Sequence, residues 1–139
     1  MADNVYIHMY KDNPTAGGTD GTQVSEQTET EPTTVTLTVA GSDVESGAIK
    51  LALRCESGYQ TSGDTTITPT GTSANKWALA PDNGGSPGTF GSYGDPLTIS
   101  DTIGATNYIF WAKAKALASE DPQNDASVDL KIDATIEAT

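Results

Sequence analysis

Basic residues, cysteine and histidine are all scarce in this chain of 139 residues. Seven lysines and arginines stand against 19 aspartates and glutamates, which gives a formal net charge of -12. Because binding to phosphate backbones or anionic lipid needs clustered basic side chains, this acidic balance argues against nucleic acid and against a membrane as partners. A single cysteine excludes an internal disulfide, so packing must stabilise the fold.

Long apolar runs are also lacking. Nowhere does the chain approach 18 consecutive apolar residues, and residues 1–7 contain neither the basic segment nor the apolar stretch of a signal peptide. We therefore expect synthesis in the cytoplasm. At this length the chain fits one domain with an appendage.

A strict alternation of polar and apolar residues is the clearest pattern that the chain does contain. It runs through residues 127–138, where Val128, Leu130 and Ile132 share one face, and it predicts one continuous β-strand with a buried face. Similar patterns predict further strands at residues 4–10, 34–39, 49–55, 65–70, 76–80, 97–100 and 107–116. The strands at 34–39 and 49–55 are expected to form a hairpin across a turn at 41–47.

The alanines of residues 108–118 would also suit a helix. Aromatic and β-branched residues at 107–111 alternate with the others, and this alternation favours a strand. Residues 11–34 are rich in Gly, Thr, Asp and Glu, and their few apolar residues predict an exposed arm. We therefore expect an N-terminal strand and arm at residues 1–33. The domain at 34–139 is predicted to be an all-β, immunoglobulin-like antiparallel sandwich of about seven to eight strands.

Two segments carry a resemblance to a known class of proteins. The first segment consists of residues 97–101, a short turn and residues 108–114. It resembles the passage from strand E to strand F of immunoglobulin-like modules. Residues 4–14, followed by the Thr/Gly-rich arm, are similar to immunoglobulin-like accessory virion proteins of tailed bacteriophages that decorate the capsid. This resemblance implies a non-enzymatic structural protein on the capsid exterior of a virion. Its partners would be the major capsid protein, copies of itself, or both.

The N-terminal strand is the segment expected to bind the partner, by adding to the edge of a neighbouring sheet. The predicted partner-binding residues are Val5, Tyr6, Ile7, His8, Met9 and Tyr10. Two alternatives stay open. The protein could be a tail or neck component, or it could bind a host-surface glycan through four aromatic residues, namely Tyr59, Trp77, Phe90 and Tyr93.

Residues 82–96 form a glycine-rich loop in which Phe90 and Tyr93 are candidate contact residues. Each ring could grip a sugar or a neighbouring subunit, or fold back to cap the end of the sandwich.

Catalytic and metal chemistry have little support in the sequence. His8 is expected on the exposed face of its strand, and Cys55 is expected to be buried because it is in phase with Leu51 and Leu53. The acidic residues of the arm and of residues 120–125 lack the spacing of a calcium loop. The prediction is therefore a protein with no catalytic residue, no metal and no cofactor.

Overall fold

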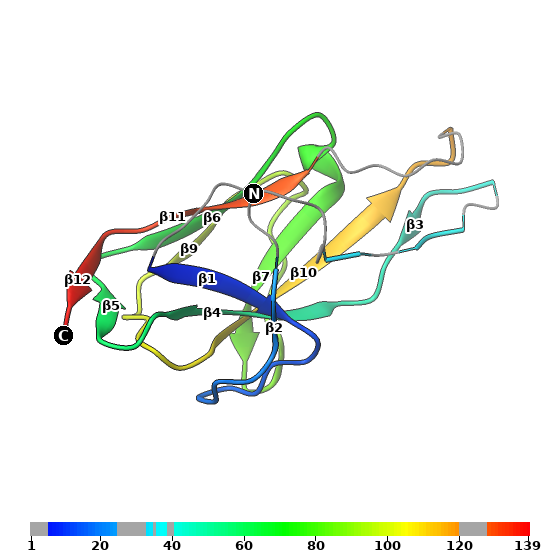
Figure 1. Ribbon diagram of the computed structural model, residues 1–139. Helices are drawn as coiled ribbons and strands as arrows, with labels where there is room; N and C mark the ends of the chain where they lie inside the picture. Colours follow the sequence, from blue (N-terminus) through cyan, green and yellow to red (C-terminus); the bar gives the residue numbers. More distant parts are fainter. Residues whose placement is uncertain (1–5, 25–32, 35, 39–40, 120–127) are drawn as a thin grey trace.

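The computed structural model is an all-β protein built of antiparallel sheets (Figure 1). It describes residues 6–24, 33–34, 36–38, 41–119 and 128–139. Within these ranges there is no α-helix, and a single turn of 3-10 helix, η1 (Ala74–Lys76), leads into a strand. The predicted all-β, antiparallel class is therefore confirmed.

One sheet, which we call the main sheet, holds seven strands. Its strand order is β2-β1-β4-β10-β7-β8, and β3 also pairs with β10. The bounds of its members are β1 (Ile7–Lys11), β2 (Thr22–Gln23), β3 (Val44–Glu45), β4 (Ile49–Cys55), β7 (Trp77–Asn83), β8 (Ser86–Pro87) and β10 (Tyr108–Ala116).

The remaining strands form two smaller sheets. In one, β6 (Thr65–Thr70) lies between β9 (Leu97–Ile99) and β11 (Asp129–Asp133). In the other, β5 (Tyr59–Thr61) pairs with β12 (Ile136–Ala138). One hydrophobic cluster joins the main sheet to the β11-β6-β9 sheet, and it includes Met9, Leu51, Leu53, Ile67, Ile99, Phe110, Leu130 and Ile132. Burial of each large apolar side chain stabilises the fold by about 1.5–3 kcal/mol.

Strand β10 lies at the centre of the main sheet and pairs with β4 on one edge and β7 on the other. Phe110, Ala112 and Ala114 are buried, and Trp111 and Lys113, which alternate with them, are half-buried. The prediction of a strand rather than a helix is confirmed here. The alanines fit because small side chains pack closely where two sheets meet.

The predicted C-terminal strand is interrupted. Its alternation is retained, since Leu130 and Ile132 are buried while Lys131 is exposed, but it divides into β11 and β12. The two halves pair with different strands, β6 and β5, so the chain changes direction between them. The backbone oxygen of Thr135 accepts a hydrogen bond from the N–H of Ser62 at this break.

The expected hairpin between residues 34–39 and 49–55 is wrong at the positions that the structure describes. Residues 36–38 are not in a strand, and residues 35, 39 and 40 lie outside the described part. Both edges of β4 are occupied instead, by β1 and by β10. The alternation at 34–39 therefore indicated a strand that the described residues do not form.

The N-terminal strand is part of the main sheet, where β1 lies beside β4 (Figure 1). The expectation that residues 11–34 are an exposed arm holds only in part for residues 11–24, most of which are exposed but which are anchored to the main sheet. Pro14 and Val24 are buried, and β2 pairs with β1. Residues 25–32 lie outside the described part, so the boundary between residues 33 and 34 stays a prediction.

Candidate functional site

The predicted partner-binding segment is mostly buried. Ile7 and Met9 belong to the hydrophobic core, and His8 and Tyr10, on the opposite face of β1, are also buried. Val5 lies outside the described residues. Tyr6 is the member whose side chain is exposed, at 43%. A partner that contacts the described part of this segment through side chains therefore meets Tyr6.

Tyr6 stacks on Tyr59, and we call these two residues the aromatic pair. Their ring centroids are 4.3 Å apart, with 29° between the ring planes. The backbone oxygen of Tyr6 accepts a hydrogen bond of 2.8 Å from the N–H of Glu56, and Tyr59 packs against the core. Within the described part of the chain, Tyr6 is the one large hydrophobic residue that is exposed. The pair therefore forms a fixed aromatic surface where β1 begins.

His8 is buried, so its predicted exposure is wrong. Side chains from β2 and from the turn after β4 contact the imidazole. Its Nε2 atom is 2.8 Å from Oε1 of Glu56, and its Nδ1 atom is 3.4 Å from Nε2 of Gln23. His8 thereby links β1 to the turn that supports the aromatic pair.

Cys55 is buried, as the sequence predicted. Its Sγ atom donates to the backbone oxygen of Ile103 at 3.4 Å, and burial raises the pKa of the thiol. A thiol held in this way is a poor nucleophile, because the thiolate is the reactive form.

A second group of polar side chains, which we call the hairpin network, fastens residues 12–21 to the main sheet. Its centre is the buried amide of Asn107, whose Nδ2 donates to the backbone oxygen of Thr15 at 3.0 Å and to Oδ1 of Asp20 at 2.9 Å. Nη1 of Arg54 donates to Oδ1 of Asn107 and to the backbone oxygen of Asp20, both at 2.8 Å. The Arg54 guanidinium lies 3.5 Å above the ring centre of Tyr10.

The charge of Asp20 is favoured by this network. The backbone N–H and then the hydroxyl of Thr15 donate to its carboxylate, and these bonds lower the pKa of Asp20. The chain turns just before, at Asp12 and Asn13, where φ is 64° and 58°. Asp and Asn are the non-glycine residues that best tolerate this conformation, and Pro14 follows them. The sequence Asp-Asn-Pro could have indicated a tight turn here instead of an open arm.

The glycine-rich loop at residues 84–96 lies along the edge of β7. Backbone N–H groups of Gly88, Gly91 and Gly94 donate to oxygens of Pro81, Leu79 and Trp77, at 2.8, 3.0 and 2.8 Å. A Cβ atom on Gly88 would lie 3.1 Å from the oxygen of Pro81, so glycine permits this close approach. The loop thereby covers a sheet edge that would otherwise be open to pairing.

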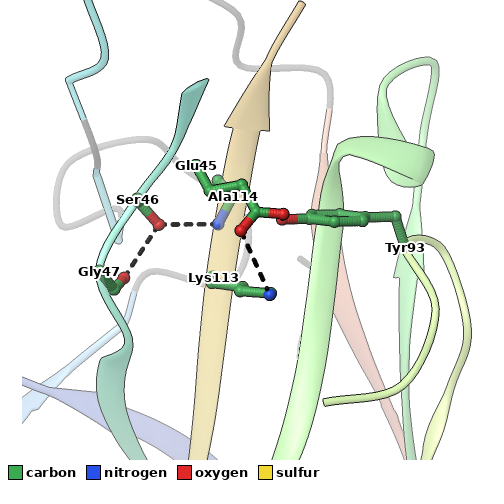
Figure 2. Close-up of polar contacts among 6 residues, drawn as sticks. All are labelled: Glu45, Ser46, Gly47, Tyr93, Lys113 and Ala114. Atoms are coloured by element: carbon green, nitrogen blue, oxygen red, sulfur yellow. Dashed lines mark hydrogen bonds and ion pairs between the residues drawn. The ribbon is translucent and has the colours of Figure 1, made fainter. Parts of the chain in front are cut away.

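Phe90 and Tyr93 lie together on the outer face of β10. With Glu45, Lys113 and Lys115 they form what we call the loop cluster, of which Figure 2 shows Glu45, Tyr93 and Lys113. The Lys113 ammonium is 4.8 Å from the ring centre of Phe90, and the Lys115 ammonium is 4.4 Å from that of Tyr93. The Tyr93 hydroxyl donates to Oε1 of Glu45 at 2.8 Å, and Nζ of Lys113 is 3.6 Å from Oε2.

Two ionisation equilibria reflect these contacts. Burial, and then the hydrogen bond to Glu45, raise the pKa of Tyr93 to about 12. The Tyr93 hydroxyl, and then the charge of Lys113, lower the pKa of Glu45. Both rings are half-buried and have partners within the cluster. Of the two expectations for this loop, folding back is therefore the closer one, although the rings cover the face of β10 rather than the end of the sheets.

A bulge positions Glu45. Between the pairs Lys115↔Glu45 and Ala112↔Ile49, residues 46–48 face only residues 113–114 of β10. The Ser46 hydroxyl accepts a hydrogen bond from the N–H of Ala114 at 2.9 Å (Figure 2). The extra residue bends the strand and directs Glu45 toward Tyr93.

The four aromatic residues of the glycan hypothesis do not meet. Trp77 packs against the core, and Tyr59 stacks on Tyr6. Phe90 and Tyr93 share the loop cluster with the two lysines. A sugar-binding surface made of all four rings is therefore not present.

Among the described side chains, no group of three or more His, Cys, Asp or Glu residues is arranged to hold a metal ion. In the same part of the chain, no helix has the length and apolar character needed to cross a membrane. Comparisons of the chain with protein-family models, with curated proteins and with solved structures found no match.

Proposed function

We propose that this chain is a non-enzymatic structural virion protein that decorates the capsid exterior of a tailed bacteriophage. The major capsid protein, copies of the chain itself, or both would be its partners. The sequence resemblance is the origin of this proposal, and the aromatic pair supplies the surface through which attachment would occur.

The proposal includes an immunoglobulin-like sandwich. Support comes from the pairing of β6 with β9 and of β7 with β10. These pairs match B with E and C with F in the immunoglobulin arrangement. The flanking strands differ, since β4 pairs with β10 and the late strand β11 pairs with β6. The chain would therefore have the two central strand pairs of that fold, with different strands, β4 and β11, beside them.

The exposed stack of Tyr6 on Tyr59 is the single observation that carries the attachment. Tyrosine is enriched at protein interfaces because its rigid ring gives a large contact area at low entropic cost. Stacking on Tyr59 fixes the Tyr6 ring in advance, which reduces the ordering that binding would require. Attachment would then rest on side chains, since β1 lies between β2 and β4 in the main sheet.

Cryo-electron microscopy of native particles, with and without the protein, tests the location. We expect ordered copies on the capsid lattice, with Tyr6 and Tyr59 facing the shell. Copies confined to the tail would support the tail or neck alternative, and absence from particles would refute the proposal.

Rebinding to stripped particles tests the surface. Tyr6→Ala should weaken binding about thirtyfold, the effect of losing an interface residue worth about 2 kcal/mol. Tyr93→Ala is the matched control, because it removes a tyrosine of the loop cluster. Equal losses in the two variants would contradict a role for the aromatic pair.

A further inference from the structure

A groove of about 410 Å³ lies on the outer face of the main sheet. It is found where the end of β1, the start of β4 and the middle of β10 meet, and residues 33–34 form one side. Its volume falls in the usual range for sites of small ligands, about 300–1,000 Å³. Five of its lining residues carry the argument, namely Lys11, Asp12, Asn13, Lys50 and Trp111.

Trp111 gives the groove a flat aromatic wall. Its Nε1 atom donates to Oδ1 of Asp82 at 2.9 Å, so the orientation of the indole is fixed. The ring is half-buried and packs beside Tyr10 and Ile109. A fixed indole offers a stacking surface for a ligand at little cost in side-chain entropy.

Two lysines and one aspartate line the groove, so basic residues outnumber acidic ones there, which is unusual for this molecule. Lys11 and Lys50 are two of seven basic residues in a chain of net charge -12. A ligand that enters this groove therefore gains most if it carries negative charge where the lysines lie.

Polar atoms on the remaining walls favour a ligand with hydroxyl groups. Asn13 can donate and accept, and the Asp12 carboxylate can accept from a hydroxyl. A bare anion would use the lysines alone, whereas a sugar acid would use every wall.

We propose that this groove binds a carboxylated saccharide unit. The carboxylate lies toward Lys11 and Lys50, an apolar face of the sugar ring stacks on Trp111, and ring hydroxyls bond with Asn13 and Asp12. The site is separate from the aromatic pair, because Tyr6 and Lys11 lie at opposite ends of β1, about 17 Å apart along the strand. Saccharide binding and attachment to a particle are therefore independent and can be tested on different samples.

Titration calorimetry with the full-length protein tests the proposal. The probes are methyl β-glucuronide, methyl β-glucoside, which lacks the carboxylate, and acetate, which lacks the sugar. We expect saturable binding of the glucuronide that is at least about tenfold tighter than that of either other probe. Equal binding of acetate would reduce the groove to an anion site and overturn the proposal, as would no binding of the glucuronide.

Two variants separate a site from general charge attraction. Lys50→Gln should weaken glucuronide binding about tenfold or more. Lys131→Gln removes the same charge from β11, where the exposed Lys131 side chain lies 3.6 Å from Asp133, and should leave binding unchanged. Equal weakening in both variants would contradict the proposal.

A spectroscopic readout keeps the test independent of affinity. In nitrogen-15 NMR the chain gives two indole N–H signals, because it has two tryptophans. Glucuronide should shift the Trp111 signal and leave that of Trp77 in place, with Trp111→Phe used to assign the signals. Saturable binding that moves neither signal, or both equally, would place the ligand elsewhere.

Discussion

Residues 11–24 and residues 84–96 are both rich in glycine and poor in apolar residues, yet they are fixed to the main sheet in different ways. The first segment is held by the hairpin network, whose central amide, Asn107, is 5% exposed. The second is held by backbone bonds to the edge of β7 and by the half-buried loop cluster. Composition therefore indicates that a segment is a loop. How firmly the loop is fixed depends on how deeply the residues that hold it are buried.

The difference predicts unequal energetic costs. A hydrogen bond made by a buried group is expensive to lose, because its partner stays buried without water. A bond near solvent is replaced by water when it is broken. The hairpin that contains β1 and β2 should therefore unfold only with the core, whereas the loop at 84–96 should open locally.

The largest effect is expected from Asn107→Ala. This substitution removes the hydrogen bonds that the buried Asn107 side chain makes with Arg54, Thr15 and Asp20, so the free energy of unfolding should fall by about 2–4 kcal/mol. Urea denaturation followed by circular dichroism measures it. Asn83→Ala, at an exposed position, is the matched control, and equal losses in the two variants would contradict the role of the network.

Arg54→Met should have the next largest effect. It removes two hydrogen bonds and the stacking on Tyr10, and about 1–3 kcal/mol of stability should be lost. A double-mutant cycle with Asn107→Ala should give a coupling energy of at least about 0.5 kcal/mol, because the two side chains share a bond. Strict additivity would show that the network does not act as a unit.

Tyr93→Phe should cost less, about 0.5–1.5 kcal/mol of the free energy of unfolding, since it breaks one hydrogen bond in a half-buried cluster. Urea denaturation measures this loss.

The wild-type protein should also lose stability between pH 10 and 12. The pKa values of Tyr93 and Tyr108 are raised from 10.0 to about 12, so the unfolded chain ionises first as the pH rises. Tyr93→Phe should flatten part of this loss, and Tyr108, which donates to Asp101, should account for the rest. An unchanged profile would be evidence against the raised pKa of Tyr93.

The smallest effect is expected in acid. The pKa of Asp20 is lowered from 3.8, so its carboxylate stabilises the fold above that pH, and the contribution is lost as the pH falls through the folded value. Asp20→Asn should therefore show a shallower fall in melting temperature between pH 5 and pH 2. Asp64→Asn, at an exposed position, is the control and should follow the wild type.

Much of the fold could be predicted from the alternation of side chains. The strands at 49–55 and 65–70 have the predicted bounds, and β10 differs by one residue. Alternation does not identify partners, so the pairing of β4 with β1 was missed. The burial of residues 14 and 24 was missed, because two apolar residues hardly change the polar composition of this segment. They become buried only when the segment packs against the folded sheet.

The candidate sites were predicted only in part. Tyr6 was among the predicted residues. Its stacking on Tyr59 was not predicted, because the two residues are far apart in the sequence and no local pattern indicates their contact. Phe90 and Tyr93 do lie together, and their lysine partners follow from the outward face of β10. The groove was missed, because it combines the end of β1 with Trp111, whose position depends on the order of strands.

Hydrogen exchange of the native protein tests most directly whether the N-terminal hairpin belongs to the folded core. The account predicts that amides of β1 paired with β4 exchange as slowly as those of β10, through global unfolding. The amides of Gly88, Gly91 and Gly94 should exchange much faster, through local opening. Fast exchange in β1 with slow exchange in the loop would contradict the account.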